Sequence, residues 1–266
     1  MINIQLPQNL NYLSPFVVGN LTRVGRDFDG GYILPDNVIP MSDCLISMGL
    51  SNDWSFEIEC KRINPGIEIH AFDFSISKRK FIKKAFSGIF RLITLSHSYE
   101  KTKERINVLF SYLRFFNEDV RHHQNRIYNR VDSPVDITID EVFSKTKASN
   151  ILLKMDIEES EYRVIDDVLN YSSRISCMAI EFHDTQPFRS VFEEKIKKIQ
   201  EKYSIVHLHA NNCAGIGVDG LPEVLEITFL RNELLNSQSH RSLLPLDTLD
   251  MQNSKYVDDF EIKFSL

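Results

Sequence analysis

Short apolar runs alternate with amphipathic helical segments along most of this chain, and this alternation is what most limits the possible folds. Residues 151–155, for example, form a short and mostly apolar run, and a helical pattern follows from Ser160. Such a run is typical of a strand buried on both faces, as in parallel sheets covered by helices. Because strands that alternate with helices form βαβ units, we expect an α/β fold built on a mostly parallel sheet.

The same patterns predict seven strands and the helices between them. The strands are expected at 44–48, 67–72, 89–95, 151–155, 177–182, 203–208 and 224–230. The helices are expected at 54–63, 78–86, 100–116, 137–145, 160–169 and 188–202. We expect a single domain of residues 1–266 with three additions to this core: a cover segment at 1–40, an inserted helical and lid segment around 97–134, and a tail at 231–266 that folds back.

Composition and charge exclude several classes of protein. The 266 residues are 42% hydrophobic and 26% charged, which is ordinary for a globular protein. The formal charge of −6 argues against a nucleic-acid partner. No apolar run is long enough to span a membrane, no signal-peptide pattern opens the chain, and the four cysteines form no CxxC pair. We therefore expect a cytoplasmic protein, not integral to a membrane, that acts on a small molecule; whether it forms a homodimer is left open.

A glycine and an aspartate end the first two expected strands. Gly49 follows the first strand and opens a loop into a helix, and Asp73 follows the second. In nucleotide-binding sheets, a glycine in this place lets a ligand approach, and an acidic residue roughly 20 residues later binds the ribose hydroxyls. A tight turn would explain Gly49 equally well. Since the loop lacks the further glycines that a pyrophosphate needs, the pattern favours S-adenosylmethionine over NAD.

Acidic, imidazole and amide side chains gather after three later strands. Because the carboxyl ends of parallel strands lie at one edge of a sheet, where ligands bind, we expect these side chains to converge. They are Asp156, Glu158, Glu181, His183, Asp184, His207, His209 and Asn211, of which His207 is interpreted as a structural residue.

Four stretches carry a likeness to a known family. They are Gly-Leu-Ser-Asn-Asp-Trp-Ser-Phe at 49–56, Ala-Phe-Asp at 71–73, Leu-Lys-Met-Asp-Ile-Glu-Glu-Ser-Glu at 153–161 and Ile-Glu-Phe-His at 180–183. Together they resemble the FkbM-type branch of class I methyltransferases, over about residues 23–230. The most specific piece is Leu-Lys-x-Asp-x-Glu-x-x-Glu, although Glu159-Ser160 stands where the family commonly has a glycine.

The resemblance implies a Rossmann-like sheet of seven strands with the last one antiparallel, helices on both faces, and S-adenosylmethionine as methyl donor. It also implies transfer of the methyl group to an oxygen, often on a sugar. Asp29 and Gly31 fall in a further segment that looks like one seen in some relatives, although a surface turn would explain them as well. The residues expected to contact the cofactor are Gly49, Ser51, Asn52, Asp53, Asp73, Phe74, Ser75, Asp29 and Gly31.

Methyl transfer is an in-line displacement, in which the enzyme aligns the acceptor oxygen, the methyl carbon and the sulfur. A sugar hydroxyl is a poor nucleophile and benefits from a base or a metal. We favour His183 as the base, oriented by Asp156 or Glu181, with Glu158 beside them. Alternatively, Asp156, Glu181 and His183 hold a divalent metal such as Mg or Mn. The residues expected to contact the substrate are His209, Asn211 and Arg126.

The sequence thus predicts an S-adenosylmethionine-dependent O-methyltransferase acting on a carbohydrate, such as a sugar nucleotide or a unit of a surface polysaccharide (capsule or O-antigen). Two alternatives stand beside it. One is a nucleotide-sugar oxidoreductase, which the single-glycine loop disfavours. The other is a catalytically inactive binding module with the same fold.

Overall fold

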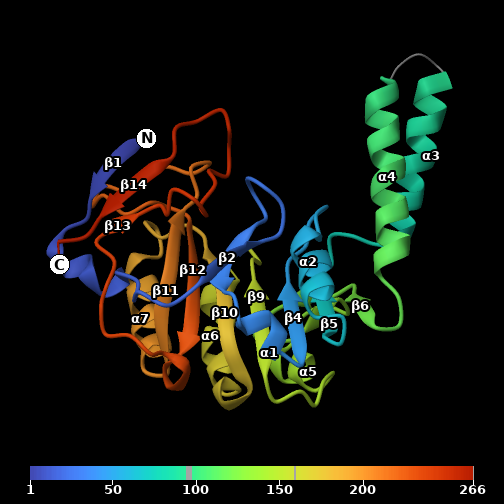
Figure 1. Cartoon of the computed structure of the whole chain (residues 1–266). Coiled ribbons are helices and arrows are strands. Elements are labelled where there is room, and N and C mark those ends of the chain that lie inside the picture. Colours follow the sequence, from blue (N-terminus) through green and yellow to red (C-terminus); the bar gives the residue numbers. More distant parts are fainter. Residues whose placement is uncertain (94–97, 159, 266) are drawn as a thin grey trace.

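A seven-stranded sheet forms the centre of the molecule (Figure 1). The computed structural model describes residues 1–93, 98–158 and 160–265. The strands of the central sheet are β4 (Cys44–Met48), β5 (Glu68–Phe72), β6 (Val120–His123), β9 (Ile151–Met155), β10 (Ile175–Phe182), β11 (Tyr203–Ala210) and β12 (Leu225–Arg231).

The strands of this sheet lie in the order β11-β12-β10-β9-β4-β5-β6. Neighbouring strands are parallel throughout, except that β12 runs antiparallel to both β10 and β11. Since β12 is also the last strand of the sheet along the chain, the predicted architecture is confirmed: seven strands with only the last one antiparallel.

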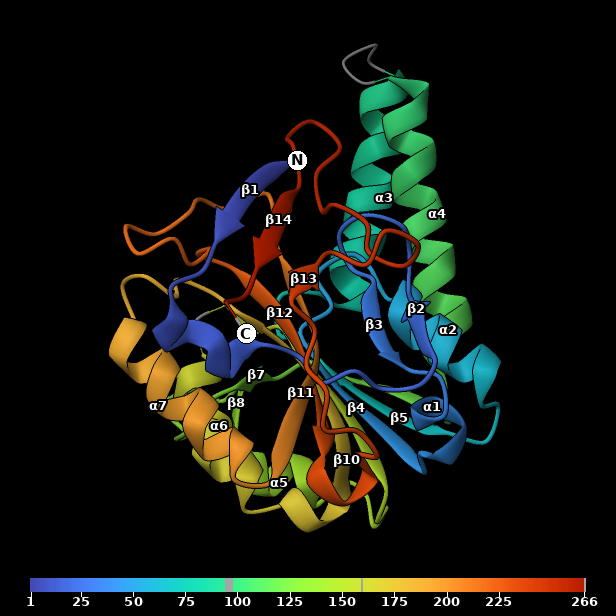
Figure 2. The same ribbon diagram turned by 60° about the vertical axis from the view of Figure 1, so that its left-hand side comes forward.

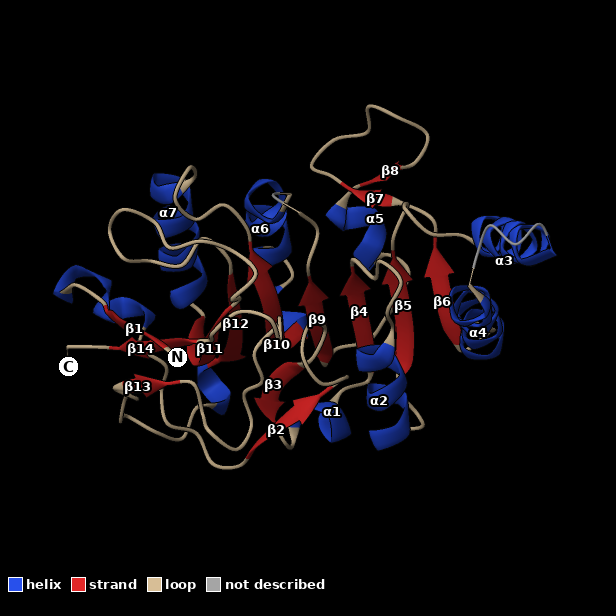
Figure 3. Cartoon of the chain, turned by 90° about the horizontal axis from the view of Figure 1, so that it is seen from above, coloured by secondary structure: helices blue, strands red, loops and turns tan. Residues whose placement is uncertain are grey.

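Helices cover both faces of the sheet, as predicted (Figure 3). One face carries α5 (Ile139–Phe143), α6 (Glu161–Leu169) and α7 (Arg189–Gln200). The other carries α1 (Val38–Met41), α2 (Ser55–Ile63) and the hairpin of β2 (Leu21–Val24) and β3 (Tyr32–Pro35). Every residue of β4 and β9 is buried, because the sheet packs against apolar side chains on both sides.

The third strand is where the sequence prediction is wrong. Residues 89–93 belong to helix α3 (Lys78–Ile93), and residues 94 and 95 lie outside the described part of the chain. The edge strand is instead β6, inside the segment expected to be a lid. Only one residue of β6, Val120, is buried, so this strand lacks the apolar run that reveals a central strand.

Helices α3 and α4 (Tyr99–Phe115) form an antiparallel pair that projects from the body of the molecule (Figures 1 and 2). Its base is anchored by an apolar cluster that includes Trp54, Phe81 and Tyr112. The indole N–H of Trp54 also donates a hydrogen bond of 3.0 Å to the hydroxyl of Ser111. We call this helix pair, residues 78–93 and 98–115, the arm.

The two ends of the chain pair with each other. Strand β14 (Phe260–Lys263) runs parallel to β1 (Ile2–Gln5) and antiparallel to β13 (Leu243–Leu244), beside β11 (Figure 1). A further small ladder joins β7 (Arg126–Ile127) to β8 (Asp136–Ile137). Within the described ranges, short 3-10 helices lie at Gln8–Leu13, Ser172–Arg174 and Asn232–Leu234. Among the described residues, no helix has both the length and the apolar character needed to cross a membrane.

Candidate active site

A cavity of about 430 Å³ opens at the carboxyl ends of β4, β5 and β9. This is the edge of an α/β sheet at which ligands bind. Several residues predicted to be catalytic or to contact cofactor or substrate line it. They are Gly49, Ser51, Asp73, Phe74, Ser75, Arg126, Asp156 and Glu158. The other residues of the lining are Leu50, Phe72, Asn125, Ile127, Ile157 and Ser160.

The carboxylate of Asp73 joins the loops that follow β4 and β5. Its Oδ2 accepts hydrogen bonds from the backbone N–H groups of Leu50 (2.9 Å) and Ser51 (2.8 Å), and its Oδ1 accepts one from Ser75 (2.6 Å). Burial alone would raise the pKa of Asp73, but the hydrogen bonds from these three residues lower it. Asp73 is therefore an anion at neutral pH, the form that can accept a hydrogen bond from a ribose hydroxyl.

Gly49 allows two loops to touch. Its φ is +84°, and a Cβ atom built on it would lie 1.7 Å from the carbonyl oxygen of Asp156. The backbone N–H of Gly49 donates to Phe72, and that of Asp156 donates to Met48, both at 2.9 Å. The Lys154 ammonium donates a hydrogen bond to the carbonyl oxygen of Gly49. The close neighbour that requires a glycine here is thus the protein's own backbone.

Three non-glycine residues around the site have a left-handed backbone. They are Ser51 (φ 51°), Glu158 (φ 53°) and Asp184 (φ 50°), which follow β4, β9 and β10 in turn. This conformation costs a non-glycine residue about 1 kcal/mol or more, and residues held in it cluster at ligand sites. Their position after three neighbouring strands marks the same edge of the sheet as the cavity does.

His183 lies at the centre of a group of carboxylates. Its Nδ1 is 2.7 Å from Oε1 of Glu161, whose side chain is fully buried. Its Nε2 faces three more acids: Asp156 and Glu158, both at 3.8 Å, and Glu181 at 3.9 Å. Glu161, rather than Asp156 or Glu181, is therefore the residue that holds the ring at Nδ1. The sequence offered a signal for this role, because Glu161 is the last acid of the Leu-Lys-x-Asp-x-Glu-x-x-Glu motif.

These acids determine the protonation of His183. Burial opposes the charged imidazole, but Glu161, Glu181 and Asp156 together raise the pKa of His183 to about 9. Burial and the nearby Asp156 and Glu226 also raise the pKa of Glu181 well above its usual range. With a pKa of about 9, His183 is protonated at neutral pH, and it must lose this proton before it can act as a base.

The predicted residues His209 and Asn211 are buried. They belong to a row of polar side chains that crosses three neighbouring strands. The strand register pairs Glu181 of β10 with Glu226 of β12, and Glu226 with His209 of β11. His209 is buried, with its Nε2 3.4 Å from Asp259 of the tail, and the acids around it raise its pKa to about 10 despite its burial. The side chain of Asn211 donates to Oε1 of Glu181 at 2.9 Å. His209 and Asn211 thus support this row and are not part of the cavity lining.

The tail contributes to this row, which the sequence reasoning missed. The amide of Asn253 donates to Glu226 at 2.6 Å, and Asp250 lies 3.0 Å from Nε2 of His207. No apolar or acidic pattern in residues 250–259 indicates these contacts. Only the fold of the tail over β11 and β12 brings them to the sheet.

The remaining predicted cofactor residues have partners within the protein. Asp53 pairs with Nε of Arg26 at 3.1 Å and accepts a hydrogen bond from the backbone of Ser55. Asp29 lies 3.6 Å from the Arg26 guanidinium. Burial and the charge of Glu226 raise the pKa of Asp29 despite Arg26.

The remaining residues predicted to contact cofactor or substrate are Gly31, Asn52 and Arg126. A Cβ atom on Gly31 would lie 2.4 Å from the carbonyl oxygen of Arg26, so Gly31 closes a turn of the 25–31 loop. Asn52 faces the base of the arm, outside the lining of the cavity. Arg126 lines the cavity, while its Nε lies 2.7 Å from Asp136.

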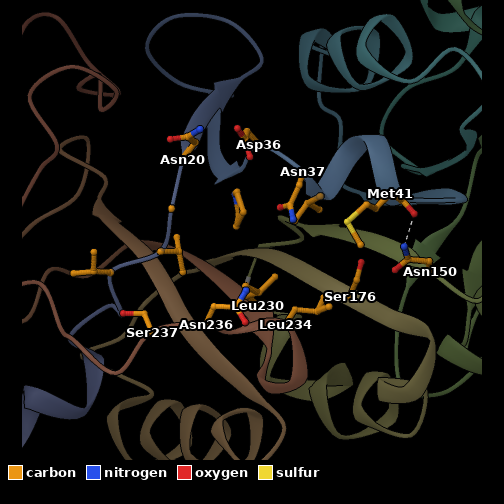
Figure 4. A pocket seen from close by; sticks show the side chains of 15 residues that line it. Asn20, Asp36, Asn37, Met41, Asn150, Ser176, Leu230, Leu234, Asn236 and Ser237 are labelled. Atoms are coloured by element: carbon orange, nitrogen blue, oxygen red, sulfur yellow. Dashed lines mark hydrogen bonds between the residues drawn. The ribbon is translucent and has the colours of Figure 1, made fainter.

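A second cavity, of about 250 Å³, lies at the opposite edge of the sheet (Figure 4). Its wall includes the side chains of Asn20, Asn37, Ser176 and Asn236, and Asn150 donates a hydrogen bond to the carbonyl of Met41 there. Asp36 is the one ionisable residue of its described lining. Because this cavity lacks paired acids and imidazoles, the candidate active site is the cavity beside His183.

Comparison with known proteins adds no family. No protein-family model matches the sequence, and no curated protein matches it. Three solved structures are similar over 71% of this chain. A fibrillarin/Nop5p complex is 10% identical, with a TM-score of 0.38 and 72% of that chain covered. A proposed rRNA methylase from Clostridium thermocellum is 7% identical, with a TM-score of 0.39 and 86% covered. A precorrin-6y C5,15-methyltransferase from Geobacter metallireducens GS-15 is 9% identical, with a TM-score of 0.34 and 80% covered.

At these identities and TM-scores, the three similarities carry no argument about activity or substrate. The likeness to the FkbM-type branch therefore rests on the motifs quoted above.

Proposed function

We propose that this protein is an S-adenosylmethionine-dependent O-methyltransferase of the FkbM type, acting on a carbohydrate such as a sugar nucleotide or a surface-polysaccharide unit. The observation that carries the proposal is the cavity between Asp73 and Asp156. One wall of the cavity offers the ionised carboxylate of Asp73 and a loop with a single glycine, without the further glycines that a pyrophosphate needs, and this suits an adenosine. Its other wall offers the acids beside His183, which favour the positive charge of a sulfonium. The carbohydrate acceptor rests on the family resemblance.

The chemistry assigned to the site is one displacement. The acceptor oxygen attacks the methyl carbon, the carbon–sulfur bond breaks with its electron pair going to sulfur, and the hydroxyl proton passes to a base. Neutral His183 would accept that proton at Nε2, while Glu161 holds Nδ1 and stabilises the resulting imidazolium. Asp156 and Glu158, on the same side of His183, would orient the acceptor.

A divalent metal is the alternative to an unassisted base. Among the described residues, ligand atoms of Asp156, Glu158 and His183 lie within 4.8 Å of one another. Two carboxylate oxygens and one imidazole nitrogen suit Mg or Mn. Glu181, which was predicted as the third metal ligand, instead accepts a hydrogen bond from the side chain of Asn211. A metal at this place would make an acceptor hydroxyl more acidic.

Cofactor binding is tested with S-adenosylhomocysteine. The ligand should raise the melting temperature, because it binds only the folded protein. Asp73→Ala should weaken its binding by calorimetry about tenfold or more, since the variant loses one ligand contact and the hydrogen bonds that hold the 49–51 loop. Asp132→Ala, at an exposed aspartate paired with Arg130, serves as a control and should bind normally. Failure of the ligand to shift the melting temperature, or stabilisation by NAD(P) instead, would contradict the proposal.

Methyl transfer is tested with a panel of nucleotide sugars and S-adenosylmethionine. Mass spectrometry should find one product heavier by the mass of a CH₂ group. EDTA should abolish transfer, with Mg or Mn restoring it, if the metal takes part; activity that persists in EDTA assigns the reaction to His183 alone. Cofactor binding without transfer to any sugar would favour the inactive binding module or another acceptor.

A further inference from the structure

The arm carries an excess of positive charge on a negatively charged protein. Residues 78–115 hold ten lysine and arginine residues against two glutamates, whereas the whole chain has a formal charge of −6. Helix α3 has no acidic residue in its first turn and is basic from its first residue, Lys78. Nothing in the proposed reaction uses this charge, because the arm's lysines lie outside the cavity lining.

The arm also exposes large apolar side chains. Phe86 and Ile89 on α3 are 69% and 41% exposed, and Phe110 and Leu113 on α4 are 65% and 42% exposed. On each helix the two residues are three apart, and they therefore share one face. On α3 the face turned to α4 is a different one, as the hydrogen bond from the Thr102 hydroxyl to the carbonyl of Gly88 indicates. On α4, Leu113 lies three turns after Thr102 and borders the face turned to α3. Large parts of these apolar side chains thus remain accessible to a partner outside the arm.

The shape of the arm leaves these side chains free to reach a flat surface. Among the described residues, the base of the arm packs on the body through Phe81, Tyr112 and Trp54. The 16 residues of α3 span about 24 Å. Figures 1 and 2 show that most of this length stands clear of the remaining elements.

We propose that the arm docks this protein on an anionic membrane surface. An exposed helix surface that carries apolar side chains among lysines and arginines suits the interface of a bilayer, with the apolar side chains at the acyl boundary and the cations, on their long stems, among anionic headgroups. A nucleic acid would satisfy the cations, but aliphatic side chains such as Ile89 and Leu113 gain nothing from a phosphate backbone. The combination of cations with exposed apolar side chains therefore favours the lipid.

Docking on a bilayer deepens the proposed function. A peripheral enzyme held there would meet acceptors that are themselves carried by the membrane, which points to a saccharide linked to a lipid. This step rests on the proposed methyl transfer. Binding to vesicles does not, because it needs neither cofactor nor acceptor.

The test is co-sedimentation of the full chain with vesicles of phosphatidylcholine containing phosphatidylglycerol, against pure phosphatidylcholine. We expect binding to the anionic vesicles only, weakened by high salt because salt screens the headgroup charge. Lys83→Glu/Lys84→Glu should lower the partition coefficient about tenfold or more. Phe86→Ser/Ile89→Ser should also lower it several-fold, by removing apolar surface from the interface.

Two matched controls lie at the opposite edge of the sheet. Lys145→Glu/Lys147→Glu makes the same charge change just before β9, and Met41→Ser removes an exposed apolar side chain from α1. Both should bind like the unaltered protein. Circular dichroism confirms that each variant is folded. No binding of the unaltered protein at low salt, equal loss in the controls, or binding to an RNA oligonucleotide in place of vesicles would each overturn the proposal.

Discussion

Replacing Gly49 with alanine is expected to destabilise the protein by more than about 3 kcal/mol and to abolish cofactor binding. The added Cβ would lie 1.7 Å from the backbone carbonyl oxygen of Asp156, which no side-chain movement can relieve. The loops after β4 and β9 would have to separate. That movement breaks the hydrogen bond between Asp156 and Met48 and displaces the backbone N–H groups of Leu50 and Ser51 from Asp73.

Gly220 provides the matched control for this substitution. Its φ of +85° is almost that of Gly49, but a Cβ atom there has no neighbour within 4 Å. Gly220→Ala should therefore show the cost of the left-handed backbone alone, about 1 kcal/mol. Urea denaturation of both variants measures the difference. Equal losses of stability would mean that the contact between Gly49 and Asp156 is not what requires a glycine.

The parts of the fold that the sequence predicted are those buried on both faces. Strands such as β4 and β9 must be apolar at every position, so their boundaries can be read from the chain. The edge strand β6 has one covered residue, and its Val-Arg-His-His sequence carries no such signal. Conversely, the apolar residues at 89–95 looked like a strand, although Ile89 continues the helical spacing of α3.

The site was predicted as a group but not in its pairings. Strand ends bring Asp156, Glu158, Glu181 and His183 together, because parallel strands finish at one edge. Which acid holds the ring of His183 depends on where helix α6 begins, and that could not be read from strand order. The row from Glu181 to His209 depends on the register of an antiparallel strand. A change of one residue in that register would have turned Glu226 to the other face.

Removing the charge of Glu161 is expected to move the titration of His183 by more than any other single substitution at the site. Glu161 is the nearest acid, at 2.7 Å from Nδ1, and it is the largest of the influences that raise the pKa of His183 to about 9 against burial. In Glu161→Gln the amide can still accept a hydrogen bond from Nδ1, but the negative charge is gone. The pKa of His183 should then fall toward or below its ordinary value near 6.5.

The same shift makes a prediction about stability. Because folding raises the pKa of His183, its contribution to stability is full below about pH 6.5 and is lost as the pH rises through about 9. In Glu161→Gln the pKa of His183 is lower, so the free energy of unfolding should depend much less on pH in the alkaline range. NMR titration of the histidine ring protons in EDTA, with urea denaturation at several pH values, measures both effects. Asp250→Asn removes the negative charge beside buried His207 and serves as the control. It should leave the pKa of His183 unchanged.

Turnover measurements distinguish the role of His183 from that of Glu161. If His183 is the base, His183→Ala should lower the rate of methyl transfer by about 10²–10⁴-fold while cofactor affinity stays close to that of the unaltered protein. For Glu161→Gln, a positioning residue, the midpoint of the pH–rate profile should move to lower pH together with the NMR titration of His183. A profile that stays near pH 9 while the NMR midpoint moves would show that the proton leaves the acceptor for another group. Asp156 and Glu158, both 3.8 Å from Nε2 of His183, are the nearest acids on the cavity wall.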